Sequence, residues 1–395
     1  MTSRRLVLTR SAALIGAAST ALLLPRLSAA QGSKIKVGLM LPYTGTFAQL
    51  GVAIENGFRL AIDEQGGKLG GREIEFFKVD DESDPPKGVE NANKLVLRDK
   101  VDVLVGTVHS GVQMGIQKVA RDTGVLNIIP NAGVLAATGP LCAPNVFRTS
   151  FSNSQPTLAL GAPMVARGHK KAVWITWKYA AGDEAFQGFR DSFLKAGGTI
   201  VKEIALPFPN VEFQAHLTEI ASLNPDAVAC FFAGGGAVKF IKDYAAAGLK
   251  GKIPLYGSGF LTEGVLDAAG PAADGVITTM HYADGLDNPR NKAFRLAYAK
   301  TFKLQPDVYA VQGYDAGQLL VLGANAVKGD FSNKKALYAA MGGATIDSPR
   351  GKWKMSPSHN PIQDIYLRQV TGGENKVIGV AAKQLADPGT GCKMG

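Results

Sequence analysis

Short apolar runs that alternate with helix-length amphipathic segments restrict the fold of this 395-residue chain more than any other feature. The runs are too short for typical helices, so each is predicted to be a buried strand. The first set is Ile35–Leu41, Ile74–Val79, Val101–Val105 and Leu126–Ile129. Strands that alternate with helices are typical of a mainly parallel sheet with helices on its faces, so the predicted fold class is α/β.

A second set of runs follows the same plan. Its members are Ala172–Trp177, Ile200–Leu206, Ala227–Phe232, Ile253–Tyr256 and Val276–Met280. Each set begins with a strand, a loop, a long helix, a double glycine (Gly66-Gly67 and Gly197-Gly198) and another strand. Because the chain is also longer than one typical core requires, we expect two similar α/β units in tandem.

The late part of the chain has a different pattern. Helices are predicted at Asn288–Phe302, Val308–Ala326 and Ser332–Ala340, and strands at Gly351–Met355 and Ile362–Val370. These elements are expected to return over the earlier units, which gives several crossings and a hinge. The predicted division is residues 31–150 plus 284–348 for lobe 1, residues 151–283 plus 349–385 for lobe 2, and a tail at 386–395.

Residues 1–30 have the organisation of a signal peptide. A basic region with three arginines precedes the apolar run Ser11–Leu24, and Ser28-Ala29-Ala30 supplies a cleavage signal. The segment Ser3–Leu8 resembles the twin-arginine export signature. The alternative is an ordinary basic region of a signal peptide that happens to contain two adjacent arginines. We therefore expect export to the periplasm by the Sec or the twin-arginine route.

Charge and cysteine usage exclude or favour further classes. The positive excess left after the leader is small and spread along the chain, so nucleic acid is not an expected partner. No other apolar stretch reaches the roughly 18 residues of a membrane span, so a soluble mature chain is expected. Cys142 and Cys392 lie in Pro/Gly-rich loops and are a possible disulfide pair, whereas Cys230 falls inside an apolar run. Whether the pair bridges stays open at this point.

Enzyme and metal signatures are missing from the sequence. There is no Cys-x-x-Cys, His-Glu-x-x-His, Gly-x-Ser-x-Gly or Walker motif, and the five histidines lack metal-ligand spacing. The acidic run Asp80–Asp84 could bind a cation, but a solvated loop before a helix that starts with Pro85-Pro86 is the simpler interpretation. We expect no metal, no cofactor and no catalysis.

The loops after the strands carry the candidate binding residues. In open α/β sheets ligands bind at the carboxyl ends of the strands, and the facing edges of two units would form a cleft. Five aromatic residues in these loops would line the cleft or pack in the core: Tyr43, Phe47, Trp177, Tyr179 and Phe260. Ser110 begins a helix, where its hydroxyl could hold a carboxylate, cap the helix, or do both. Gly234, in a triple glycine, would let a ligand approach the backbone.

Six segments carry a resemblance to a known family. They are VGLMLPYTGTFAQLG, ENGFRLAIDEQGGKLGGREIE, VDVLVGTVHSG, NIIPNAG, NVFRTSFSN and VYAVQGYDAG. Together they resemble the branched-chain amino-acid-binding (Leu/Ile/Val-type) family of type I periplasmic substrate-binding proteins of ABC importers. The resemblance implies two lobes joined by three hinge crossovers, which close on a small ligand and deliver it to a membrane permease.

The resemblance also assigns site residues. It implies that Ser110 and the backbone of Asn131, Ala132 and Gly133 bind the ligand carboxylate, and that Tyr179 covers the ligand. The other aromatic residues of the loops would then pack against the ligand body, and His109 would meet a distal polar group.

One position departs from the amino-acid-binding pattern. Those proteins carry an acidic residue after the fourth strand of the second lobe, where it pairs with the ligand ammonium, but this sequence has Gly259 there. Glu263 could replace it if the alignment shifts. Because a buried ammonium without a counter-charge is costly, the sequence better resembles the branch that binds aromatic acids. The expected protein is a monomeric solute receptor. The alternatives are a branched-chain amino-acid or amide receptor, an exported α/β enzyme, and a sensor domain for a membrane kinase.

Overall fold

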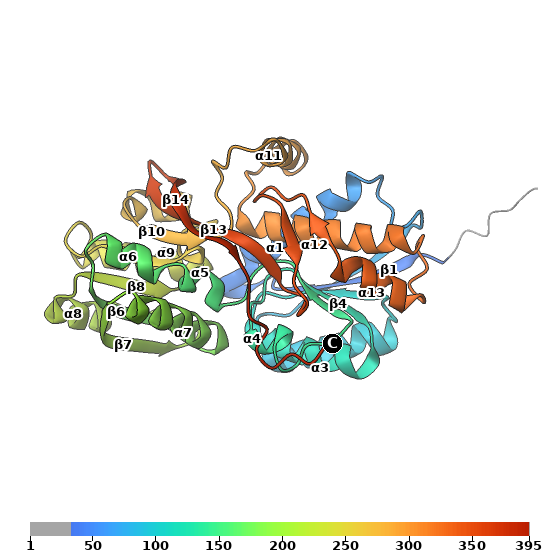
Figure 1. Ribbon diagram of the computed structural model, residues 1–395, viewed down its shortest axis with the longest axis horizontal. Coiled ribbons are helices and arrows are strands. Elements are labelled where there is room, and N and C mark those ends of the chain that lie inside the picture. Colours follow the sequence, from blue (N-terminus) through green and yellow to red (C-terminus); the bar gives the residue numbers. More distant parts are fainter. Residues whose placement is uncertain (1–32, 395) are drawn as a thin grey trace, which may run out of the picture. The chain divides into compact units, whose positions relative to one another are not determined.

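Two sheets flanked by helices carry the fold of residues 33–394, which the computed structural model describes (Figure 1). The predicted signal peptide, residues 1–30, lies outside the described residues. The first sheet has the strand order β2-β1-β3-β4-β5, and its pairs are parallel. Its strands are β1 (Ile35–Leu41), β2 (Ile74–Asp80), β3 (Val103–Val105), β4 (Leu126–Ile129) and β5 (Val146–Arg148). The parallel pairing confirms the predicted α/β class.

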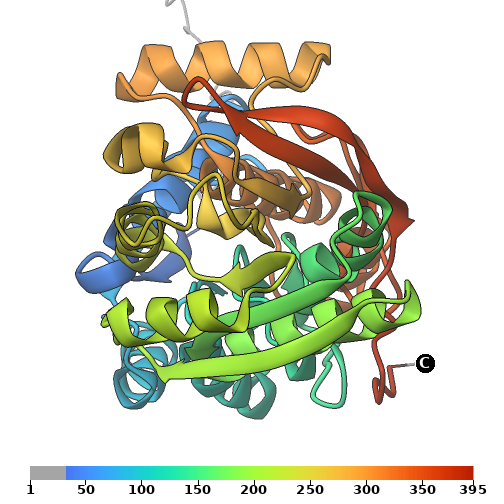
Figure 2. The same cartoon turned by 90° about the vertical axis from the view of Figure 1, so that its left-hand side faces the viewer.

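The second sheet combines a parallel part with an antiparallel extension. The parallel part is β6 (Lys171–Lys178), β7 (Thr199–Pro207), β8 (Ala227–Phe231), β9 (Leu255–Ser258) and β10 (Ile277–Met280). The extension is β11 (Thr345–Ile346), β12 (Trp353–Met355), β13 (Pro361–Thr371) and β14 (Glu374–Leu385). The β13–β14 hairpin, red in Figure 2, joins this sheet through antiparallel pairing of β13 with β10.

Helices connect the strands. Those that follow the strands of the first sheet are α1 (Ala48–Asp63), α2 (Pro85–Asn93), α3 (Ser110–Thr123) and α4 (Leu135–Thr138). Those within the second set are α5 (Ser154–Leu158), α6 (Gly161–Ala166), α7 (Ala180–Lys195), α8 (Gln214–Leu223), α9 (Gly234–Ala246) and α10 (Leu266–Ala269). The late helices are α11 (Pro289–Phe302), α12 (Val308–Ala326) and α13 (Lys334–Gly342). Within residues 33–394 no helix combines the length and apolarity needed to cross a membrane.

Helix α12 completes the core of the first sheet although it comes late in the chain. Its Leu319 and Leu320 share a hydrophobic cluster with Val37 of β1. The packing of α12 against α1 is very close, because a Cβ built on Gly313 would lie 2.0 Å from the carbonyl oxygen of Ile54. Glycine is therefore needed where the two helices touch.

Three connections cross between the two sheets, as expected. They are 149–153 after β5, 281–288 after β10, and the stretch from α13 to β13. Arg350 in the third connection donates to the carbonyls of Thr149 (2.6 Å) and Ser150 (3.0 Å) in the first. Its Nε lies 3.1 Å from the carboxylate of Asp315 on α12. A buried arginine thus holds two crossings and a helix together.

The exact lobe boundaries stay a prediction. Strand β12, which the sequence assigned to lobe 2, is hydrogen-bonded to β13 of the second sheet. However, its Trp353 and Met355 pack in the hydrophobic cluster of the first sheet. The third crossing is therefore shared between the two cores.

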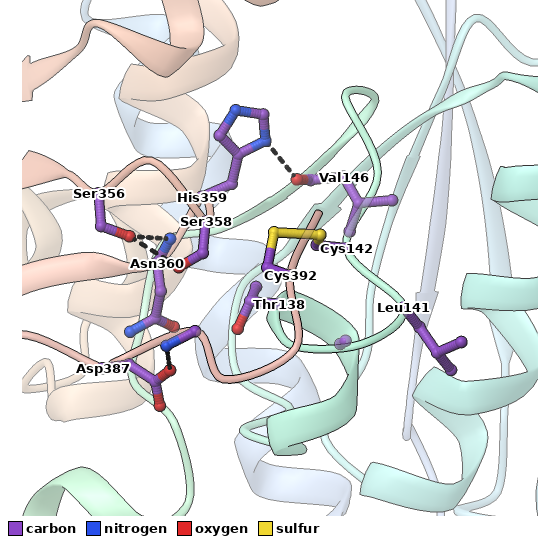
Figure 3. The surroundings of a disulfide bond; sticks show 12 residues. Thr138, Leu141, Cys142, Val146, Ser356, Ser358, His359, Asn360, Asp387 and Cys392 are labelled. Atoms are coloured by element: carbon purple, nitrogen blue, oxygen red, sulfur yellow. Dashed lines mark hydrogen bonds between the residues drawn. A yellow bond between two sulfur atoms is a disulfide. The ribbon is translucent and has the colours of Figure 1, made fainter. Parts of the chain in front are cut away.

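A disulfide links the end of the described chain to the first sheet. Cys142, in the loop before β5, bonds to Cys392 with a Cα–Cα distance of 5.5 Å (Figure 3). Nearby, His359 contacts the carbonyl of Val146 with its Nδ1 at 2.9 Å. Cys230 is buried in β8 and is not part of a disulfide.

Candidate functional site

The carboxyl-end loops of both sheets surround a small cavity. The cavity is narrow: the space between its atoms amounts to about 300 Å³ with open solvent included, and only about 20 Å³ of it admits the centre of a water-sized sphere. Its lining is Phe47, Leu50, Val108, Asn131, Gly133, Phe151, Asn153, Tyr179, Ala181, Phe231, Ala233, Phe260 and Tyr309. None of these residues carries a charge. Of the residues proposed from sequence, the cavity brings together Phe47, Asn131, Gly133, Tyr179 and Phe260.

Aromatic rings form a large part of the cavity wall, since six of the thirteen lining residues are Phe or Tyr. Phe260 lies 4.7 Å from Phe151 and 6.0 Å from Tyr309, measured between ring centroids. Phe231 and Tyr179 lie 6.3 Å apart on the side of the second sheet. Such a wall favours a planar apolar ligand body, because rings gain from both burial and oriented ring contacts.

The first turn of α3 supplies a hydroxyl next to the cavity. Ser110 Oγ accepts a hydrogen bond from Asn153 Nδ2 at 3.2 Å, which leaves its own hydrogen for another acceptor. Ser110 is the first helical residue and not the N-cap, so the simple N-cap interpretation was wrong. His109 is the N-cap, and its Nδ1 accepts from the Gly111 N–H at 3.1 Å.

The loop after β4 supplies backbone groups. Asn131 lines the cavity, and its Nδ2 donates to Gln312 Oε1 at 2.6 Å. The Ala132 N–H donates to the Thr107 carbonyl at 2.9 Å, so it is already used in this conformation. The Gly133 N–H has no acceptor among residues 33–394 and is available to a ligand. The Asn131 N–H likewise has no acceptor among residues 33–394, so the loop offers two free backbone donors, at Asn131 and Gly133.

Other predicted residues lie behind the cavity. Trp177 is buried, and its Nε1 donates to the Asn210 carbonyl at 2.7 Å, so it supports the wall from outside. A Cβ on Gly234 would lie 2.4 Å from the Thr46 carbonyl, so this glycine allows the second sheet to meet the loop after β1. The ring of Tyr43 lies under Lys78 Nζ at 3.8 Å. None of these three residues lines the cavity, and of the contacts named only that of Gly234 with Thr46 joins the two sheets.

His109 is also a wall-supporting residue. Its ring stacks on Tyr179 with centroids 4.9 Å apart. Burial lowers the pKa of His109 to about 4, so the imidazole is neutral at physiological pH. A neutral ring explains how Nδ1 can accept the hydrogen bond from Gly111.

Sequence reasoning missed four prominent lining residues: Phe151, Asn153, Phe231 and Tyr309. Three of them lie inside segments that carried the family resemblance, and Phe151 and Asn153 belong to the first crossing between the sheets. A residue on a crossing lies between the lobes, so the predicted crossing could have indicated that Phe151 and Asn153 lie near the ligand. Tyr309 is 1% exposed, and its hydroxyl has no hydrogen-bond partner among residues 33–394. Burial raises the pKa of Tyr309, so the phenol remains a neutral donor.

Neither of the two positions considered for an acidic residue, Gly259 and Glu263, places a carboxylate in the cavity. A Cβ on Gly259 would lie 2.5 Å from both Arg368 Nη2 and Met280 Cβ, so the chain leaves no room for a side chain there. Glu263 is buried, pairs with Arg368 and accepts from the Val308 N–H at 3.1 Å. The cavity therefore offers no counter-charge to an ammonium group.

Two sheets, three crossings and a cavity between the facing loops define a two-lobed solute-binding protein. The chain matches the model of the periplasmic binding protein family over residues 34–375 and belongs to that family. The predicted resemblance is thereby confirmed. The family serves transport, which gives an extracytoplasmic receptor as the general class.

Individual relatives refine this picture. The chain is 31% identical over 377 residues to Leu/Ile/Val-binding protein homolog 6 of Brucella melitensis biotype 1, covering 92% of this chain and 95% of the relative. It is 56% identical to the solute-binding protein of an ABC transporter from R. palustris, solved in complex with benzoate, with a TM-score of 0.89 and coverage of 91% and 99%. A solute-binding protein from Rhodopseudomonas palustris BisB5, in complex with 3,4-dihydroxybenzoic acid, is 32% identical with a TM-score of 0.85 and coverage of 90% and 99%.

Proposed function

We propose that this protein is the extracytoplasmic receptor of an ABC importer and that its ligand is a small aromatic carboxylate. The observation that carries the proposal is the cavity itself, which has aromatic walls, no charged lining residue and unused donors. The two similar proteins with benzoate and 3,4-dihydroxybenzoic acid support the same ligand class. We also propose export by the Sec or twin-arginine route, a monomeric state and delivery to a membrane permease.

The ligand carboxylate would be held by uncharged donors. The Ser110 hydroxyl and the Gly133 N–H are free to donate, and the first turn of α3 adds the partial positive charge of a helix N-terminus. Phe151 and Phe260 would enclose the ring, and the Tyr309 phenol would donate to a polar group of the ligand. No lining residue is a base or an activated nucleophile, which supports binding without turnover.

Closure follows from contacts that exist only when the lobes meet. A ligand shifts the equilibrium between open and closed forms only by its differential affinity for the two. Here the aromatic wall contains residues from both sheets, such as Phe47 and Phe231, so the full apolar contact requires the closed form.

A thermal-shift panel tests the ligand class. Benzoate, hydroxybenzoates, aliphatic acids, leucine and valine are added separately at high concentration. A ligand at 100 times its dissociation constant adds about 2.7 kcal/mol of stability, which gives a clear rise in melting temperature. We expect the aromatic acids to stabilise the protein and the amino acids to leave it unchanged. Stabilisation by leucine or valine alone would establish the amino-acid receptor instead.

Ser110→Ala tests the carboxylate assignment. Loss of one hydrogen bond to a charged group should weaken benzoate binding by roughly tenfold or more. The melting temperature without ligand should change little, because the substitution removes only the 3.2 Å bond that Ser110 Oγ accepts from Asn153, and Asn153 Nδ2 keeps its 2.8 Å bond to Glu184. Ser222→Ala, an exposed hydroxyl on α8, serves as control. Unchanged affinity in Ser110→Ala, measured by calorimetry, would remove this residue from the site.

A further inference from the structure

Glu184 connects helices that belong to different sheets. It lies in the first turns of α7, which follows β6 of the second sheet. Its Oε2 accepts from the N–H of Leu135 at 2.9 Å, and Leu135 begins α4 after β4 of the first sheet. The N-cap of α4 is Val134, whose side chain cannot cap, so the carboxylate from the other sheet satisfies this helix end.

The same oxygen reaches the ligand cavity through Asn153. Asn153 Nδ2 donates one hydrogen to Glu184 Oε2 at 2.8 Å and is 3.2 Å from Ser110 Oγ, to which it donates the other. Asn153 is itself fixed to the first sheet, because its backbone N–H donates to the Gly133 carbonyl at 2.7 Å. Glu184 therefore fixes the amide that in turn fixes the oxygen of Ser110.

We propose that Glu184 is an interlobe latch that positions Ser110 for the ligand carboxylate in the closed form. This inference rests on the proposed function. Opening the hinge would move α7 away from α4 and break the bond from Glu184 to Leu135, and it would shift Glu184 relative to Asn153 at the end of the first crossing. The latch therefore contributes to ligand affinity without touching the ligand.

The surroundings of Glu184 agree with this role. The side chain is partly buried, and burial raises its pKa, while the two hydrogen bonds and the charge of Arg148 oppose this shift. With one oxygen accepting both bonds, the geometry does not depend on a second carboxylate oxygen. A glutamine could accept both bonds through its single carbonyl oxygen, whereas an alanine could accept neither.

The test compares Glu184→Ala, Glu184→Gln and the control Asp191→Ala, an exposed acid on the same helix beside Arg190. Benzoate binding is followed by stopped flow, and melting temperatures are measured with and without ligand. Glu184→Ala should raise the dissociation constant roughly tenfold, mainly through faster dissociation. Its melting temperature without ligand should equal that of the wild type, and Glu184→Gln should recover most of the affinity. Asp191→Ala should behave as wild type.

Two results would overturn the latch. One is an affinity of Glu184→Ala equal to that of wild type. The other is a large drop in its ligand-free melting temperature with an unchanged ligand-induced shift, which would mark a purely structural role. A wild type that binds no aromatic acid contradicts the proposed ligand class instead. In that case the same variants are compared with the member of the thermal-shift panel that does stabilise the wild type, such as leucine: weaker binding in Glu184→Ala, but not in Asp191→Ala, supports the latch, and equal binding overturns it.

Discussion

The phenol of Tyr309 is a buried polar group with an unmet bonding requirement. Its hydroxyl has no partner within residues 33–394, although its ring is packed against Phe260 in the cavity wall. A buried donor without an acceptor costs free energy unless a ligand or an ordered water supplies one. A polar atom of the ligand at this point would supply the hydrogen bond that no group among residues 33–394 gives the Tyr309 hydroxyl.

Tyr309→Phe tests that requirement. Removing the hydroxyl should lower the affinity for the bound acid by roughly tenfold, and it should leave the ligand-free stability unchanged or slightly higher. Tyr244→Phe is a matched control, because the Tyr244 hydroxyl donates to the Ile253 carbonyl at 2.8 Å away from the cavity. The control should lose about 1 kcal/mol of unfolding free energy and retain full affinity. Calorimetry and urea unfolding provide the two readouts, and equal affinity in Tyr309→Phe would contradict the assignment.

Part of the site could be predicted at the level of single residues. The glycine at position 259, where an acidic residue was expected, indicated an uncharged cavity. This could be predicted because the charge of a residue is read directly from the sequence. Phe151 and Tyr309 escaped prediction because they become neighbours only after the crossings fold back. The sequence also could not show which backbone N–H groups of the loop after β4 are free. The Ala132 N–H, for example, is used by the Thr107 carbonyl, and this bond depends on the local path of the backbone.

At the scale of elements, the strands and helices of both parallel sheets were predictable, whereas the last strand was not. The bounds of β1 and β4 and of helix α12 agree with those expected from the apolar pattern. Strand β14 was missed because it pairs with β13 alone and leaves residues such as Val377 and Val380 exposed. A strand that buries little surface shows little apolar periodicity.

The contact between α1 and α12 gives an element-scale prediction. In an isolated helix, replacing glycine by alanine gains about 1 kcal/mol. Gly313→Ala should instead destabilise the protein by about 1–3 kcal/mol, because the new Cβ would lie 2.0 Å from the backbone oxygen of Ile54. Gly235→Ala in α9, where a Cβ meets nothing within 4 Å, is the control and should be neutral or stabilising. Urea unfolding measures both, and a gain in Gly313→Ala would show that the helices can separate freely.

At the scale of the whole molecule, the disulfide between Cys142 and Cys392 closes a loop with a sequence separation of 250. Cross-links across long loops restrict the unfolded chain strongly, and their loss typically costs about 2–4 kcal/mol. We expect a reducing agent to lower the melting temperature of the wild type. The double variant Cys142→Ser/Cys392→Ser should melt at that lower temperature and show no response to the reducing agent. A response that persists in the double variant would rule out this bond as the cause.

The late position of α12 also affects how the chain reaches its folded state. The hydrophobic cluster around Val37 is complete only when α12 has joined it, and α12 is separated from the first sheet in the sequence by the whole parallel part of the second sheet. Contacts between such distant segments form slowly, because the intervening chain must first be ordered. An N-terminal half that cannot complete its own core stays loosely structured during synthesis. For export by the Sec route, one of the two routes proposed above, late completion of this core would let the polypeptide cross the membrane before it folds.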